Sequence, residues 1–266
     1  MRCCKAVLHS LLVLSGMFVS QGHASVTGTK VPFSAEAIQQ MPGEETHNTR
    51  IFVAADRVRM EYSRNGNRLV EIVDLDAGRS YLLLPSQREY ILHEAPAHLR
   101  ELGKSTSLQA NPCAANPQAQ CDRLGEEQVS GRDAVKWQMV VEADGRPMRS
   151  LIWIDKQRKL PLRQLWPDGT VVEMSRQGQE RLDGRQTEKW QMQLMRSDGE
   201  TLTSQQWYDL ELQIIIREQL PGGYSRGLRN IEVGEQPPEL FQVPSDYQRV
   251  TPPRNPQSQS QGGMQR

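Results

Sequence analysis

Alternating apolar and polar positions along most of this chain predict a protein built from β-strands. The segment 57–63 shows the pattern most clearly, because Val58, Met60 and Tyr62 alternate with charged or polar residues. A period of two places neighbouring side chains on opposite faces, which is typical of a half-buried strand. Further strands are expected at 69–73, 81–84 and 89–92, with turns at Asn65-Gly66-Asn67, Asp76-Ala77-Gly78 and Pro85-Ser86.

The remaining segments before residue 123 have weaker patterns. Residues 50–54 indicate a strand, whereas residues 33–40 fit either a strand or a helix, because they hold two Ala and two Gln. Residues 95–102 predict a short helix, and residues 103–122 an irregular loop. No alternation of strands with helices is present, so a parallel sheet is not expected.

A nine-residue phrase occurs twice in the chain. Gly131–Met139 (GRDAVKWQM) returns as Gly184–Met192 (GRQTEKWQM), and the match continues beyond the phrase. The later positions that recur with a spacing of 54 residues are Gly145, Trp153, Asp155, Arg163, Pro167 and Gly169. A fixed period indicates one supersecondary unit used twice. The units 124–178 and 179–234 each predict about four antiparallel strands joined by hairpin turns, within one continuous meander.

The first strand of each unit carries large apolar residues on one face. In the first unit these are Trp137, Met139 and Val141, and their counterparts are Trp190, Met192 and Leu194. The tryptophans that the repeat places are expected to pack in the core, and the alternative is that they line an apolar cavity.

Residues 1–24 are typical of a secretory signal peptide. Arg2 and Lys5 precede an apolar stretch, and Ala24 provides a small residue before the expected cleavage site. The stretch is shorter than the roughly 20 residues of a transmembrane helix, so export to the periplasm is favoured over a membrane anchor. Cleavage would leave about 240 residues, enough for one large β domain or two small ones. One domain, 25–250, is predicted, with N-terminal strands at 32–94 and a helix and disulfide loop at 95–123.

Charge and cysteine usage narrow the classes of partner. The chain has 32 basic and 32 acidic residues, and loss of Arg2 and Lys5 leaves a net charge of −2. The chain has no surplus of basic residues that would indicate nucleic acid or an anionic membrane surface as a partner.

Cys113 and Cys121 remain after Cys3 and Cys4 are removed, and a cysteine pair in an exported protein indicates a disulfide. A redox pair would more usually be Cys-x-x-Cys, and a metal site would need nearby histidines.

No catalytic constellation can be assembled from the sequence. Motifs such as Gly-x-Ser-x-Gly, a phosphate-binding glycine loop and His-Glu-x-x-His are absent. The histidines of the mature chain fit surface positions, so no metal, cofactor or enzyme activity is expected. The repeated Arg163 and Arg217 are expected to form ion pairs with acidic residues on the solvent-exposed face of their strands, and contact with an anionic head group is the alternative. From Thr251 to Arg266 the polar composition predicts a disordered tail.

Several short motifs occur in a familiar order. They are Phe33-Ser-Ala35, Arg50-Ile-Phe-Val53, Arg57-Val-Arg-Met-Glu61, Leu82-Leu83-Leu84-Pro85 with Tyr90, and Leu240-Phe241-Gln-Val-Pro244-Ser-Asp-Tyr247. Their order resembles the exported bacterial lipoprotein-carrier superfamily (LolA/LolB-like), including a related lipoprotein-sorting family of unknown function. The resemblance implies a mainly β fold: a strongly curved antiparallel meander sheet, or unclosed half barrel, with helices that plug its concave side. This sequence itself shows only one convincing short helix, so a half barrel with one or few short helices is expected. It matches no functional residue of the carriers to this chain.

Two functional hypotheses follow. The first is a non-catalytic periplasmic binding protein that holds a lipid, acyl chain or lipoprotein on the concave face of the half barrel. The candidate cavity residues are Met60, Tyr62, Trp137, Met139, Trp190 and Met192. The alternative is a structural component of an envelope protein complex that recruits a partner by an edge strand or by the tail. An apolar cavity of several hundred cubic ångströms would favour the first.

Overall fold

The computed structural model describes residues 29–94, 112–115, 118–143 and 145–251. Within these ranges it contains strands, three short 3₁₀ helices and no α-helix. The 3₁₀ helices are η1 (Pro112–Ala115), η2 (Pro221–Gly223) and η3 (Pro238–Phe241). The strands are β1 (Phe33–Gln40), β2 (His47–Val53), β3 (Arg57–Arg64), β4 (Asn67–Asp74), β5 (Arg79–Leu84), β6 (Glu89–Glu94), β7 (Ala119–Val129), β8 (Arg132–Ala143), β9 (Arg146–Asp155), β10 (Pro161–Leu165), β11 (Val171–Leu182), β12 (Arg185–Met195), β13 (Thr201–Asp209), β14 (Ile215–Gln219), β15 (Ser225–Val233) and β16 (Gln248–Arg249).

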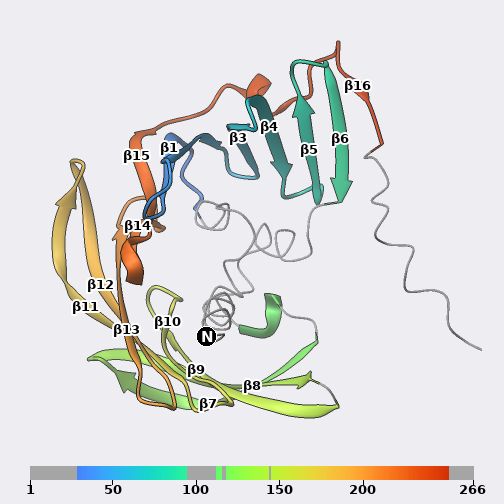
Figure 1. Cartoon of the computed structure of the whole chain (residues 1–266). Helices are drawn as coiled ribbons and strands as arrows, with labels where there is room; N and C mark the ends of the chain where they lie inside the picture. Colours follow the sequence, from blue (N-terminus) through green and yellow to red (C-terminus); the bar gives the residue numbers. More distant parts are fainter. Residues whose placement is uncertain (1–28, 95–111, 116–117, 144, 252–266) are drawn as a thin grey trace, which may run out of the picture.

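All of these strands belong to a single, strongly curved sheet (Figure 1). The 16 strands follow the order β16-β6-β5-β4-β3-β2-β1-β15-β14-β13-β12-β11-β10-β9-β8-β7. Neighbours are antiparallel, except that β16 runs parallel to β6. The two ends, β7 and β16, do not pair with each other. The predicted mainly β, unclosed antiparallel sheet is therefore confirmed.

Two meanders meet in the middle of this sheet. One runs from β1 to β6 and the other from β7 to β15, and they join where β1 pairs with β15. Of the two structures left open for residues 33–40, the strand is correct. Phe33 and Ala35 pair with Val53 and Ile51 and are buried, because packing between strands outweighs the modest helix propensity of this segment.

The two faces of the sheet can be told apart by what packs on them. In Figure 1 the short green segment of η1 lies inside the curve. A disulfide joins Cys113 of η1 to Cys121 of β7, which confirms the predicted pair. Cys121 lies directly opposite Met139 of β8, so both belong to the concave face. On the convex face, Phe241 of η3 packs in a cluster with Val70, Ile72 and Leu83.

Irregularities in strand pairing recur at the same place in both repeats. The register shifts between Arg123 and Gly125 in β7, and again between Arg176 and Gly178 in β11. Both glycines have φ near 150°, at 148° and 154°, a conformation that only glycine adopts readily. Because β-bulges bend a strand and increase its twist, these two sites contribute to the curvature of the sheet.

The main core lies where the two meanders join. It contains Phe33, Ile51 and Met60 from the first meander and Leu212 and Ile216 from the second. A further buried cluster contains Val129, Ala134, Trp153, Leu162, Trp190 and Tyr208. Many of the apolar side chains of the predicted strands are therefore packed against one another in these clusters.

Several predictions fall outside the residues that the structure describes. They are the signal peptide at 1–24, the helix at 95–102, most of the loop at 103–122 and the tail from residue 252. Within the described ranges, no helix is both long enough and apolar enough to cross a membrane.

Replacement of Cys121 by Ser should lower the free energy of unfolding by about 2–3 kcal/mol, because the disulfide closes a short loop and restricts the unfolded chain. Urea unfolding of the oxidised protein measures the difference. The double variant Cys113→Ser/Cys121→Ser should match the single variant, which controls for the free thiol. Equal stability of wild type and both variants would show that the bond is not formed in the protein.

Candidate functional site

Strand register places the six predicted cavity residues on one face. Trp137 of β8 begins a row of residues that pair from strand to strand. The row continues through Ile152, Gln164, Val172 and Leu194 in β9 to β12. Met192 and Trp190 lie two and four positions before Leu194 in β12, so all three share one face of the sheet. From Trp190 a second row leads through Gln206, Glu218 and Arg226 to Gln39. From β1, Ala35 pairs with Ile51 and Ile51 with Met60, so Met60 and Tyr62 lie on the same concave face.

The six residues differ in how much of each side chain is accessible. Met60 is 1% exposed and Trp190 is 5% exposed, so both belong to packed clusters. Tyr62, Trp137, Met139 and Met192 are half-buried. The structure brings all six to one face and leaves four of them partly open, and their role in binding a ligand stays a prediction.

Two further methionines that the sequence analysis did not select lie on the same face. Met148 pairs with Val141, and Met174 pairs directly with Met192. Met148 is 42% exposed, and Met174 is half-buried. We call Met139, Met148, Met174 and Met192 the methionine strip. Methionine is unbranched and polarisable, so it adapts to apolar partners of different shape.

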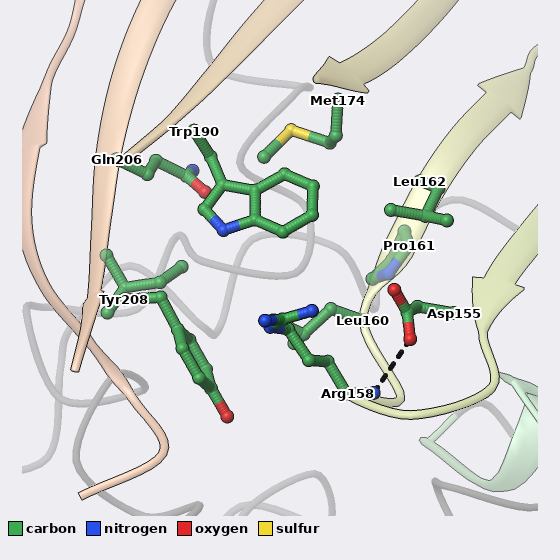
Figure 2. A pocket seen from close by; sticks show the side chains of 10 residues that line it. Asp155, Arg158, Leu160, Pro161, Leu162, Met174, Trp190, Gln206 and Tyr208 are labelled. Carbon is green, nitrogen blue, oxygen red and sulfur yellow. Dashed lines mark hydrogen bonds between the residues drawn. The ribbon is translucent and has the colours of Figure 1, made fainter. Parts of the chain in front are cut away.

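A small cavity lies beside Met174 of the methionine strip (Figure 2). Its volume is about 20 Å³, which is roughly the space of one water molecule. This cavity is far smaller than the several hundred cubic ångströms that would have favoured an enclosed ligand site. An acyl chain does not fit inside it and would have to lie along the strip. The lining residues are Asp155, Arg158, Leu160, Pro161, Leu162, Met174, Trp190, Gln206, Tyr208 and Ile215.

Arg158 brings a positive charge to this otherwise largely apolar cavity. Its side chain is 12% exposed and forms an ion pair with Glu188. The guanidinium carbon lies 5.4 Å from the ring centroid of Trp190 and 5.9 Å from that of Tyr208, within the range of cation–π attraction. Nη1 of Arg158 is buried and has no hydrogen-bond partner among the described residues.

Residues that recur in both repeats form a matching arrangement on the opposite face. Trp153 lies between Lys136 and Arg163, whose charged groups are 4.8 and 5.7 Å from the ring centroid. Its indole N–H donates a hydrogen bond to Glu127. The second repeat copies this arrangement with Lys189, Trp207, Arg217 and Glu180. These recurring residues therefore serve the fold.

The two repeated arginines behave differently from each other. Arg163 forms the expected ion pair, with Nη2 3.1 Å from Glu173. For Arg217 the contact that stands out is with Trp207: its guanidinium carbon lies 5.7 Å from the ring centroid. In both repeats the arginine lies over a tryptophan, and this ring contact was not visible from strand alternation alone.

A buried aspartate fixes the turn that follows the tryptophan strand in each repeat. Asp155 accepts backbone hydrogen bonds from Gln157 and Arg158 at 2.7 and 2.8 Å and pairs with Arg132. Burial raises the pKa of Asp155, but the Arg132 guanidinium and the two backbone N–H groups lower it more, so its pKa lies below the ordinary 3.8. The turn therefore depends on a charged carboxylate.

Replacement of Asp155 by Asn should destabilise the protein at neutral pH but much less in acid. A carboxyl group whose pKa is lowered on folding stabilises the fold above its unfolded pKa, about 4, and this contribution is lost as pH falls through the folded pKa. Urea unfolding at a series of pH values from 7 to about 3 measures the difference. The exposed neighbour Asp133 provides the control variant Asp133→Asn. A difference that stays constant with pH would contradict this account.

Comparisons with known proteins give structural neighbours only. No family model and no curated protein matches the chain. A LolA superfamily protein from Nitrosomonas europaea is 8% identical over 82% of this chain and 94% of its own, with a TM-score of 0.37. The hypothetical lipoprotein YmcC from Escherichia coli is 9% identical over 86% of this chain and 98% of its own, with a TM-score of 0.29.

A chain of the Pseudomonas aeruginosa MucA/MucB complex is also similar. It is 14% identical over 79% of this chain and 91% of its own, with a TM-score of 0.21. The LolA-like resemblance seen in the sequence motifs thus also appears among solved structures. At such identities and TM-scores the matches carry no argument about this chain, so the function is argued below from its own residues.

Proposed function

We propose that this protein is a non-catalytic binding protein of the bacterial cell envelope that holds an apolar chain on the concave face of its sheet. The observation that carries the proposal is the methionine strip, in which four flexible apolar side chains lie partly open on the inner side of the curve. Trp137 and Val141 extend the strip along β8 and are also half-buried.

The size of the hydrophobic contribution favours a long chain as the ligand. Each buried methylene group contributes about 0.8 kcal/mol, so a chain that buries roughly twelve of them gains about 10 kcal/mol. Association costs about 4–15 kcal/mol in lost freedom of motion. A chain that buries fewer than about five methylene groups gains less than the smallest of these costs and would not be retained, whereas a long acyl chain exceeds it.

Two features support a location outside the cytoplasm. The predicted signal peptide at 1–24 would direct export, and the disulfide between Cys113 and Cys121 suits an oxidising compartment. We propose the periplasm as the place where the ligand is held.

Titration of the mature chain with a fluorescent long-chain fatty acid tests the proposal. We expect saturable emission that unlabelled palmitate displaces, because both compete for the methionine strip. Decanoate should compete more weakly, since it buries fewer methylene groups. Emission that never saturates, or that palmitate does not displace, would contradict specific binding.

A free sheet edge supports a second candidate function, the recruitment of an envelope protein. Among the described residues, strand β7 ends the sheet and pairs with β8 alone, and Leu124 in it is 51% exposed. An open edge can accept a strand from a partner. A crosslinked pull-down from the envelope tests this idea, and Leu124→Asp should remove any partner that adds to this edge. A partner retained equally by the variant would count against the edge.

A further inference from the structure

The cavity at the turn between β9 and β10 joins an apolar wall to a buried cation. Leu162, Met174 and Trp190 form the wall, and the guanidinium of Arg158 points between Trp190 and Tyr208 (Figure 2). Met174 also belongs to the methionine strip and pairs with Met192 in it, so this part of the strip borders the cavity.

Arg158 keeps one hydrogen-bond donor unused in this cavity. Its guanidinium pairs with Glu188 and stacks between two rings, while Nη1 is buried without a partner among the described residues. A buried donor that lacks an acceptor costs free energy, and more so when it carries charge. An acceptor atom placed in the cavity would therefore be bound with a gain.

One carboxylate beside Arg158 is shared between two guanidinium groups. Glu188 pairs with Arg158 and with the more exposed Arg176, while Arg132 is paired with Asp155. Among the polar groups of the cavity wall, the amide of Gln206 already donates to Glu218 at 2.8 Å. Burial raises the pKa of the Tyr208 hydroxyl above its ordinary 10.0.

The second repeat shows that the turn itself does not require an arginine. Leu212 holds the position equivalent to Arg158, and Asp209 accepts its backbone N–H at 2.8 Å, as Asp155 does for Arg158. Leu212 is 0% exposed and packs in the main core. The turn therefore does not require the charge of Arg158, which serves contacts outside the turn, such as its ion pair with Glu188.

We infer that Arg158 forms an anion subsite for the carboxylate of a long-chain fatty acid whose alkyl chain lies on the methionine strip. A space of about 20 Å³ beside Arg158 admits about one oxygen-sized atom. Nη1 is shielded from solvent in the free protein, so the guanidinium turns toward this space to meet one carboxylate oxygen, and the rest of the ligand lies outside. The inference rests on the proposed function and specifies its ligand class as a single-chain carboxylate.

Competition against the fluorescent fatty acid tests the subsite with palmitate, methyl palmitate and monopalmitoyl phosphate. Palmitate should bind about 10-fold more tightly than its methyl ester, since a hydrogen bond to a charged group contributes at this level. Equal affinity of acid and ester would overturn the subsite and leave the proposed function standing. Failure of both to bind would overturn the two together. Tighter binding of the phosphate than of palmitate would overturn the carboxylate assignment.

Two variants of Arg158 sharpen the test. Arg158→Leu, which copies the second repeat, should lower palmitate affinity about 10-fold more than ester affinity. Arg158→Lys keeps the charge and loses the guanidinium fork, so palmitate affinity should fall to an intermediate value. A loss that is equal for acid and ester in both variants would contradict a carboxylate contact. The comparison of ligands on the wild-type protein decides the question even if Arg158→Leu folds poorly.

Discussion

Replacement of Asp209 by Ala is expected to lower the free energy of unfolding by about 3–5 kcal/mol. Asp209 is buried and accepts hydrogen bonds from Arg185 at 3.0 Å and from the backbone of Glu211 and Leu212 at 2.9 and 2.8 Å. Its removal leaves two backbone N–H groups without their acceptor. It also leaves the largely buried Arg185 guanidinium with the exposed Glu211, 3.0 Å away, as its carboxylate partner. Leu212, which this turn positions, would also lose its place in the main core. Urea unfolding at pH 7 measures the effect.

The exposed turn residue Asp198 provides the matched control. Its carboxylate accepts a single backbone hydrogen bond, from Glu200 at 3.0 Å, on the surface. Asp198→Ala should therefore cost about 1 kcal/mol or less. Similar losses for Asp198→Ala and Asp209→Ala would contradict the importance that we assign to the buried turn.

The double variant Met139→Asp/Met192→Asp should weaken binding of the long-chain fatty acid by about 100-fold while the protein stays folded. A bound apolar chain would displace water from the two introduced carboxylates, and this desolvation costs several kcal/mol. Both methionines are half-buried, so in the free protein the new carboxylates can reach water. Probe titration and thermal unfolding of the same samples measure the two quantities.

Neighbouring residues on the convex face supply the control for this experiment. Gln138 and Gln191 precede the two methionines, are half-buried and point to the other side of the sheet. Gln138→Asp/Gln191→Asp carries the same added charge and should leave affinity within about twofold, since screened charges at a distance act weakly. Equal loss of binding in both double variants, or unfolding of the methionine variant, would count against a binding face.

Strand alternation was sufficient to predict which residues share a face, because that rule is local. Met60 and Tyr62 follow it in β3, and Trp137 and Met139 follow it in β8. The pairing of β1 with β15 joins segments that are far apart in sequence, and nothing local specifies it. The bulges contribute to the curvature of the sheet, and the disulfide to η1 shows which face is concave. Neither feature can be read from the alternation of residues along one strand.

Accessibility was harder to predict than orientation. Met60 and Trp190 lie on the predicted face, but Leu212 packs in the cluster that buries Met60, and Arg158 covers part of Trp190. Both covering residues come from turns. Met148 could have been found from its alternation with Ile152. Arg158 stands out in the sequence only when the two repeats are aligned, because the second repeat has Leu212 at the equivalent position. Its ion-pair partner Glu188 belongs to the second repeat, so alternation within one strand could not connect the two residues.

Native mass spectrometry of the protein purified from periplasm without detergent tests the central claim most directly. The account predicts bound acyl species at close to one per protein molecule, and lipid extraction should identify them as single-chain carboxylates. A mass equal to that of the bare mature chain, with no lipid in the extract, would contradict stable binding of an apolar chain on the concave face.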